Sequence, residues 1–206
     1  MMSPVYWARA KRQLAQKDPM MAALFKAFPR ISLESRGEPF FTLARSIVGQ
    51  QISVKAAESI WNRVVVMVPD MRPSTMLSAG EFQLRACGLS GRKIEYIIHL
   101  SQLFQDGSLC ITDWQYMPDE EVVADLVRVK GIGRWTAEMF LMFNLLRPDV
   151  LPVDDLGLQK AVSHYYFFGE PVSREGLRDL AETWRPWRSV ATWYLWRGLE
   201  PMSVAY

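Results

Sequence analysis

The sequence predicts an all-α protein, and three observations carry that prediction. Apolar residues recur at the spacing of three and four that is typical of helices, for example through residues 40–65. Residues that favour helix N-termini stand just before such runs, at Ser53 and Ser90. The chain lacks the alternation of apolar and polar residues that would indicate strands. We expect about ten helices.

Composition is typical of a globular intracellular protein. Half of the 206 residues are hydrophobic, which argues against disorder, and the length suffices for a large core. A net charge of +2 does not by itself indicate a nucleic-acid partner. Cys87 and Cys110 match neither a zinc spacing nor a disulfide framework. Because we find no secretory signal and no apolar run of membrane-spanning length, we expect a soluble, cytoplasmic protein without a membrane partner.

Turn-forming residues divide the apolar runs into short helices. Pro29 ends the second helix, and polar Gly49-Gln50-Gln51 interrupts the third run, where a solvated turn is the ordinary explanation. We expect a loop over 31–40 and a linker over 113–118. Besides the region 119–160, the expected helices cover residues 7–18 and 20–28, 40–48, stretches that begin at Ser53 and Pro73, and residues 92–107, 161–169, 174–184 and 188–199.

A glycine turn joins two apolar helical runs within residues 119–146. Glycine permits backbone conformations that a side chain disfavours, and it lets a partner approach the backbone closely. The first amides of the following helix have no partners within that helix and lie at its positive end, so they favour an anion such as a DNA phosphate. A tight helix connection without a ligand is the ordinary alternative. The candidate phosphate-binding residues are Lys130, Gly131, Ile132, Gly133, Arg134 and Thr136.

An acidic pair, Asp154-Asp155, follows the turn at Pro152 and precedes another apolar helical run. One of the two carboxylates can cap that helix, which is a structural explanation for one aspartate but not for two. A carboxylate at a helix N-terminus is stabilised in its ionised form by the amides and the helix dipole. Such a group suits a reaction that requires a negative charge or a base at neutral pH.

These two features occur together in a known family. The stretches LVRVKGIGRWTAEMF and LPVDDLGLQ resemble the helix-hairpin-helix DNA glycosylase superfamily, and within it DNA-3-methyladenine glycosylase II. FFTLARSIVGQQIS, CGLSGRKIEYI and WRPWRSVATWYLWR resemble further segments of that family in the same order. The resemblance implies a two-lobed helical bundle that contains a helix-hairpin-helix motif, with an active-site cleft between the lobes.

The resemblance also implies a domain organisation and a partner. Residues 1–206 form a single glycosylase domain, with one lobe over roughly 36–146 that includes the hairpin at 119–146. The second lobe combines 1–35 with 147–206. The N-terminal β-rich domain of longer bacterial members has no counterpart, so the chain resembles the compact members. The expected partner is double-stranded DNA that contains damaged bases, bound by a monomer in the bacterial cytosol or nucleoid.

By resemblance, Asp155 is the catalytic residue, and it stabilises an oxocarbenium-like sugar, activates water, or does both. Trp135, Met139 and Trp196 correspond to residues that surround the flipped base, although Met139 replaces an aromatic residue of the family. Stacking on aromatic rings offsets the free energy needed to flip a base out of the duplex, and a positively charged methylated purine adds cation–π attraction. Core packing is the alternative role for Trp196.

Two departures from other members bear on the reaction. Trp135 occupies the position of the lysine nucleophile in members with lyase activity, so we expect a monofunctional enzyme. The cysteine-rich C-terminal segment of iron–sulfur members is absent, so we expect no iron–sulfur cluster and no required cofactor. A Na⁺ or K⁺ ion is expected by analogy at the backbone carbonyls of Val127, Val129 and Gly131.

Residues Gln50, Gln51 and Ile52 match the loop that family members insert into the duplex, and Gln51 stands where the best-known bacterial form has a leucine wedge. The resemblance therefore implies excision of alkylated purines such as 3-methyladenine and 7-methylguanine by hydrolysis of the N-glycosidic bond. Two alternatives stay open: a non-catalytic protein that recognises damage, and a glycosylase for hypoxanthine, ethenoadenine or uracil.

Overall fold

The computed structural model describes residues 3–199, and these contain twelve helices and no strand. The all-α prediction is confirmed. Two expected caps are present as well, since the hydroxyls of Ser53 and Ser90 accept hydrogen bonds from the amides of Ala56 and Lys93. The described residues contain slightly more helices than the ten or so expected, in part because the short helix α7 (Ile111–Trp114) overlaps the segment predicted as a linker.

By its internal contacts the chain divides into two compact units, which are described separately. Within the described residues, unit 1 comprises 3–35 and 141–199, and unit 2 comprises 36–140. The sequence placed a lobe boundary after residue 146, whereas this division lies between Phe140 and Leu141, inside α9 (Arg134–Phe143). The predicted cleft between lobes stays a prediction.

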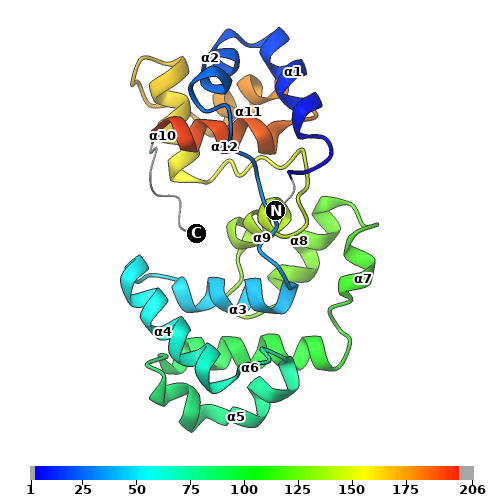
Figure 1. The fold of residues 1–206 in the computed structure, drawn as a ribbon, viewed down its shortest axis with the longest axis vertical. Helices are drawn as coiled ribbons and strands as arrows, with labels where there is room; N and C mark the ends of the chain where they lie inside the picture. The colour runs from blue at the N-terminus through cyan, green and yellow to red at the C-terminus, as the bar shows by residue number, and fades with distance from the viewer. Residues whose placement is uncertain (1–2, 200–206) are drawn as a thin grey trace. The chain divides into compact units, whose positions relative to one another are not determined.

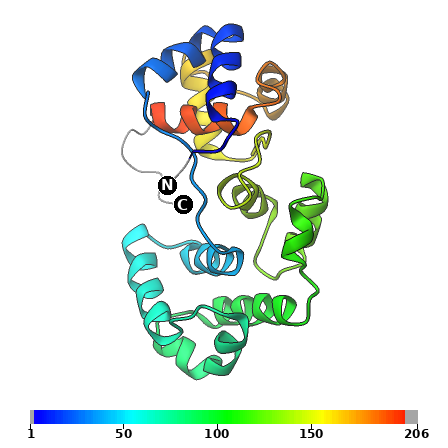
Figure 2. The ribbon, with the colours of Figure 1, turned by 45° about the vertical axis from the view of Figure 1, so that its right-hand side comes forward.

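Unit 1 is built around its last helix. α12 (Arg188–Leu199) is buried from Ser189 to Trp196 and packs against α1 (Trp7–Lys17), α2 (Pro19–Ala27) and α10 (Leu156–Tyr166), as Figures 1 and 2 show. α11 (Arg174–Glu182) completes the unit. Because nearly every side of α12 is apolar and covered, this helix forms the centre of the core.

A buried carboxylate, Asp18, fastens the N-terminal helices to the rest of unit 1. Its Oδ1 caps α2 by accepting from the amides of Met20 and Met21. Its Oδ2 accepts from the Tyr166 hydroxyl at 2.7 Å and from the Trp184 indole at 3.0 Å. Burial, followed by the neighbouring carboxylate, raises the pKa of Tyr166, so the hydroxyl keeps the proton that it donates.

Unit 2 is arranged on α6 (Gly91–Gln105), which packs against α3 (Pro39–Gly49) and α5 (Pro73–Ala86). α4 (Val54–Met67) covers α3 and α5, and α7 (Ile111–Trp114), α8 (Asp119–Val127) and the first part of α9 follow. Edge-to-face aromatic contacts link Phe104 of α6 to Phe40, and Trp114 to Phe104 and Phe140. The α9 helix is buried from Thr136 to Phe143, as its apolar composition predicts.

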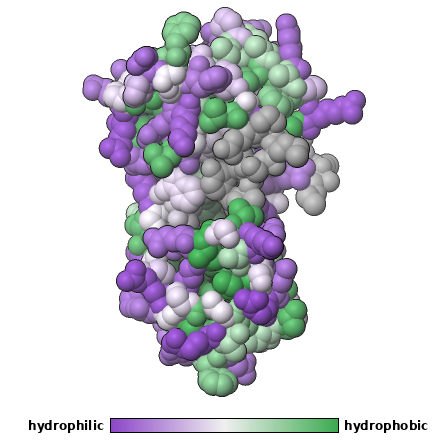
Figure 3. Space-filling view, turned by 90° about the vertical axis from the view of Figure 1, so that its left-hand side faces the viewer, coloured by the Kyte–Doolittle hydropathy of each residue, from purple (hydrophilic) through white to green (hydrophobic). Residues whose placement is uncertain are grey.

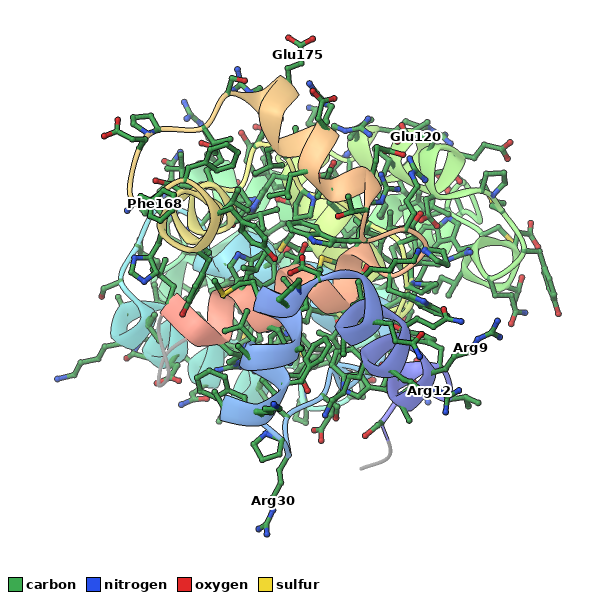
Figure 4. The ribbon with its side chains drawn as sticks, turned by 90° about the horizontal axis from the view of Figure 1, so that it is seen from above. Arg9, Arg12, Arg30, Glu120, Phe168 and Glu175 are labelled. Atoms are coloured by element: carbon green, nitrogen blue, oxygen red, sulfur yellow. The ribbon has the colours of Figure 1, made fainter. Side chains whose placement is uncertain are left out.

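The surface is mixed. Figure 3 shows hydrophilic side chains over most of one face with apolar ones between them, which is ordinary for a globular protein. In Figure 4, Arg9, Arg30 and Glu175 of unit 1 point away from the helices. Among the described residues, no helix combines the length and the apolar character that crossing a membrane requires.

Candidate active site

Asp155 is a buried carboxylate at the start of α10, with 4% of its surface exposed. Its Oδ1 accepts a hydrogen bond from the Leu158 amide at 2.6 Å, which makes it the N-cap of the helix. The same oxygen accepts from the indole Nε1 of Trp196 at 2.8 Å. Two donors from different elements therefore fix the position of one carboxylate oxygen.

Trp196 is fixed by its own neighbours. It is buried, and its ring is nearly parallel to that of Phe143, with centroids 6.1 Å apart and planes at 16°. Gly157 lies beside the pair: a Cβ atom there would stand 3.1 Å from Asp155 Oδ1 and 3.3 Å from Nε1 of Trp196. A side chain at position 157 would therefore crowd the carboxylate and the indole, which would have to shift by a few tenths of an ångström.

The second aspartate of the acidic pair has a different environment. Asp154 is exposed, and its Oδ1 pairs with the Nε of Arg174 at the start of α11. Only Asp155 is buried and bonded to an aromatic side chain. The structure therefore separates the two carboxylates that the sequence left as a pair.

The glycine turn between α8 and α9 has the backbone conformation that the sequence predicted. Gly131 has φ of +83°, and a Cβ atom there would stand 2.1 Å from Cδ2 of Tyr96 on α6. Ile132 is buried, so its side chain anchors the turn from inside. At Gly133 a Cβ atom would meet nothing within 4 Å. Of the two glycines, Gly131 alone is required by both backbone conformation and packing.

The basic residues that flank the turn already have acidic partners. Nζ of Lys130 lies 2.6 Å from Glu95, and Arg134 pairs with Glu138 and with Glu120, which Figure 4 labels on α8. Hydrogen bonding to Arg134 holds the pKa of Glu120 below its usual range, as hydrogen bonding to Lys130 does for Glu95. An anion at this turn would meet backbone amides first, and these two cations only in competition with carboxylates.

The three predicted wedge residues lie in two environments. Gln51 and Ile52 are exposed, and Gln51 adopts a left-handed φ of +58°. Gln50 is half-buried, and its side-chain Nε2 donates to the carbonyl of Gly131 at 2.8 Å. The loop between α3 and α4 therefore presents two side chains to solvent and bonds the third to the hairpin.

The other predicted site residues have the following environments. Trp135 is half-buried at the first turn of α9, and Met139 and Thr136 are buried in the same helix. Trp135 and Met139 belong to unit 2, whereas Asp155 and Trp196 belong to unit 1. The hydroxyl of Thr136 is thus on a buried residue instead of standing in solvent beside the turn.

Sequence reasoning missed several residues that surround Asp155 and the hairpin. Gly157 gave no signal except a glycine in a helical run, which is usually neutral. Tyr96 and His99 follow Lys93 on α6 at intervals of three residues, so periodicity places them on one face. Periodicity does not say that this face contacts the hairpin.

Comparison with known proteins identifies a family and several relatives. The family model described as "HhH-GPD superfamily base excision DNA repair protein" matches residues 44–186. Bacillus subtilis YfjP is 28% identical over 188 residues, which is 87% of this chain and 66% of that protein. The chain thus spans about two thirds of that relative.

Two solved structures are similar to this chain in both fold and sequence. The crystal structure of a DNA-3-methyladenine glycosidase from Bacillus halodurans has a TM-score of 0.85 and 36% identity, covering 95% of this chain and 91% of that one. The Schizosaccharomyces pombe 3-methyladenine DNA glycosylase Mag1, solved with abasic DNA, has a TM-score of 0.78 and 30% identity, covering 92% of this chain and 95% of that one.

The chain therefore belongs to the helix-hairpin-helix (HhH-GPD) superfamily of base excision DNA repair proteins. Within that superfamily, it is similar over nearly its whole length to proteins named for the removal of 3-methyladenine from DNA.

Proposed function

We propose that this protein is a monofunctional DNA glycosylase that flips alkylated purines out of double-stranded DNA and hydrolyses their N-glycosidic bonds. The observation that carries the proposal is Asp155, a buried carboxylate fixed by Trp196 and by the first turn of α10. It lies within the family match, and the similar proteins of known structure act on 3-methyladenine.

The expected chemistry places a modest demand on the enzyme. A purine methylated at N3 or N7 carries a positive charge, so it leaves readily and needs no strong general acid. Asp155 then supplies the negative charge that stabilises an oxocarbenium-like sugar, or accepts a proton from the attacking water. By the resemblance, we assign stacking of the base to the aromatic rings of Trp135 and Trp196, and contact with the base to Met139.

Phosphate binding is assigned to the backbone at the start of α9. The amides from Gly133 onward lie at the positive end of a ten-residue helix, so they favour a DNA phosphate. Lys130 and Arg134 contribute when their carboxylate partners release them. This arrangement supports sequence-independent contact with the DNA backbone, as expected for an enzyme that searches for damage.

A monovalent cation at the hairpin would have to share the backbone carbonyls with the hydrogen bonds that two of them already accept. The carbonyl of Val129 accepts from the Ile132 amide, and that of Gly131 accepts from Gln50. Each carbonyl oxygen keeps a second lone pair for a Na⁺ or K⁺ ion. Val127 would provide the third carbonyl. The ion would add positive charge beside the bound phosphate. We propose no other cofactor, and a monomer as the active form.

The test is release of bases from a panel of damaged duplexes. We expect release of 3-methyladenine and 7-methylguanine, measured by chromatography of free bases after incubation with the purified protein. The panel should include hypoxanthine, ethenoadenine and uracil, because Met139 replaces an aromatic residue and is buried in α9. Binding to methylated or abasic DNA without release of any base would favour a damage-recognition protein instead.

A further inference from the structure

The loop between α3 and α4 and the hairpin between α8 and α9 are bonded to each other within unit 2. The bond runs from Nε2 of Gln50 to the carbonyl of Gly131, at 2.8 Å. Gln50 is the C-cap residue of α3, and Gly131 is the left-handed residue of the hairpin. A side chain that the sequence assigned to the wedge thus contacts the element assigned to phosphate binding.

One face of α6 supports both of these elements. Nζ of Lys93 donates to the carbonyl of Val48 at 2.7 Å and so holds the end of α3. Three and six residues further along, Tyr96 lies against Gly131, and Nδ1 of His99 accepts from the Lys130 amide at 3.1 Å. Residues at these intervals share a helix face. α6 therefore supports both the end of α3, from which the loop starts, and the hairpin.

The loop itself is short and constrained at both ends. The Gln50 amide donates to the carbonyl of Ile47 at 3.3 Å, and Ser53 caps α4 through the Ala56 amide. Between these ends, Gln51 adopts a left-handed backbone that a non-glycine residue rarely takes without a local reason. The chain therefore turns at Gln51, the residue whose side chain is exposed.

We propose that Gln50 is a positioning residue that keeps the exposed Gln51 in fixed register with the phosphate-binding hairpin. Its bond to Gly131 makes the loop and the hairpin one body, so that a phosphate bound at the hairpin places Gln51 against the vacated space in the duplex. Gln50 thereby acts through Gln51 and the hairpin, and not through contact with the base. This inference rests on the proposed function for its DNA partner.

The test uses duplexes that carry a stable abasic analogue with 2-aminopurine opposite it, so that no excision is needed. Insertion of a side chain beside 2-aminopurine changes its stacking and hence its fluorescence. Gln50→Met keeps the length of the side chain and removes its donor, and Gln51→Met makes the same change at the exposed neighbour. The fluorescence change and the affinity are measured for both, for Gln51→Ala, and for Gln50→Met combined with Gln51→Ala.

We expect Gln50→Met to weaken binding of the abasic duplex about three- to tenfold, as loss of one hydrogen bond predicts, and to reduce the fluorescence change. In the Gln51→Ala background the same substitution should have almost no further effect on fluorescence, because its effect passes through Gln51. The proposal would be overturned if Gln50→Met reduced the fluorescence change equally in the wild-type and the Gln51→Ala backgrounds. It would also be overturned if Gln50→Met gave the same fluorescence change as the wild-type protein. Absence of any fluorescence change with the wild-type protein would overturn it too.

Hydrogen exchange of the DNA-free protein provides a second readout that does not depend on DNA. Gln50→Met should speed exchange of the amides at residues 130–133 and leave those of α5 unchanged, while Gln51→Met should change neither. Unchanged exchange at the hairpin would contradict the tether. A protein that passes both tests but releases no base would refute the proposed function and leave this inference standing.

Discussion

At the scale of single residues, one of the two donors that position Asp155 is an indole N–H. Trp196 donates to Asp155 at 2.8 Å while its ring stacks on Phe143, so the indole both supports and orients the carboxylate. The resemblance assigned Trp196 to stacking on the base, and the alternative was packing in the core. Neither role involves a hydrogen bond from the indole. The hydrogen bond adds a positioning role that neither interpretation contained.

Substitution of Trp196 by phenylalanine separates these roles. Trp196→Phe keeps an aromatic ring beside Phe143 and removes the bond to the carboxylate, so we expect the excision rate to fall about tenfold, which corresponds to about 1.4 kcal/mol. Single-turnover release of 3-methyladenine measures this rate. The matched control is Trp193→Phe on the same helix, because the indole Nε1 of Trp193 is buried without a hydrogen-bond partner in the described structure. Equal rates for the two variants would show that the Trp196 bond does not position Asp155.

At the scale of elements, the hairpin depends on two glycines in different ways. Gly131 has a positive φ and lies against Tyr96, whereas Gly133 has open space where a Cβ atom would stand. Gly131→Ala should therefore lower the free energy of unfolding by about 1–3 kcal/mol. Gly133→Ala should change it by less than about 1 kcal/mol. Urea titration measures both values, and a Gly131→Ala protein as stable as the Gly133→Ala protein would contradict the packing described at Tyr96.

The elements show how far sequence alone leads. Residues 119–146 predicted two helices and a glycine turn because helical periodicity and the conformational freedom of glycine are local properties, and the structure confirms the two helices and the turn. The carboxylate that holds Lys130 is more distant in the sequence. Glu95 lies 35 residues before Lys130, and no local pattern links them. The same holds for Gln50 and Gly131, which are 81 residues apart.

The linker expected over 113–118 illustrates a smaller error. α7 occupies Ile111–Trp114 at the start of that segment, and Trp114 is fully buried between Phe104 and Phe140. A four-residue helix leaves no periodic signal in the sequence. Its existence depends on the burial of one tryptophan, which only the fold determines.

At the scale of the whole molecule, the family places the chain among base excision repair proteins, and one substitution then defines its reaction class. By the resemblance, Trp135 stands where lyase members have their lysine nucleophile, so we expect the protein to leave intact abasic sites. We expect strands to break only after alkali treatment, with no enzyme–DNA adduct trapped by borohydride. A trapped adduct, or prompt strand nicking, would refute the monofunctional assignment and direct the search to another amine.

The central claim is that Asp155 carries the chemistry, and the acidic pair supplies its own control. Asp155→Asn keeps the size of the side chain and removes the charge, whereas Asp154→Asn makes the same change at an exposed carboxylate that pairs with Arg174. The decisive measurement is single-turnover release of 3-methyladenine from methylated DNA by both variants. We predict a loss of about a hundredfold or more for Asp155→Asn and little change for Asp154→Asn. Release by Asp155→Asn at the wild-type rate would contradict the account.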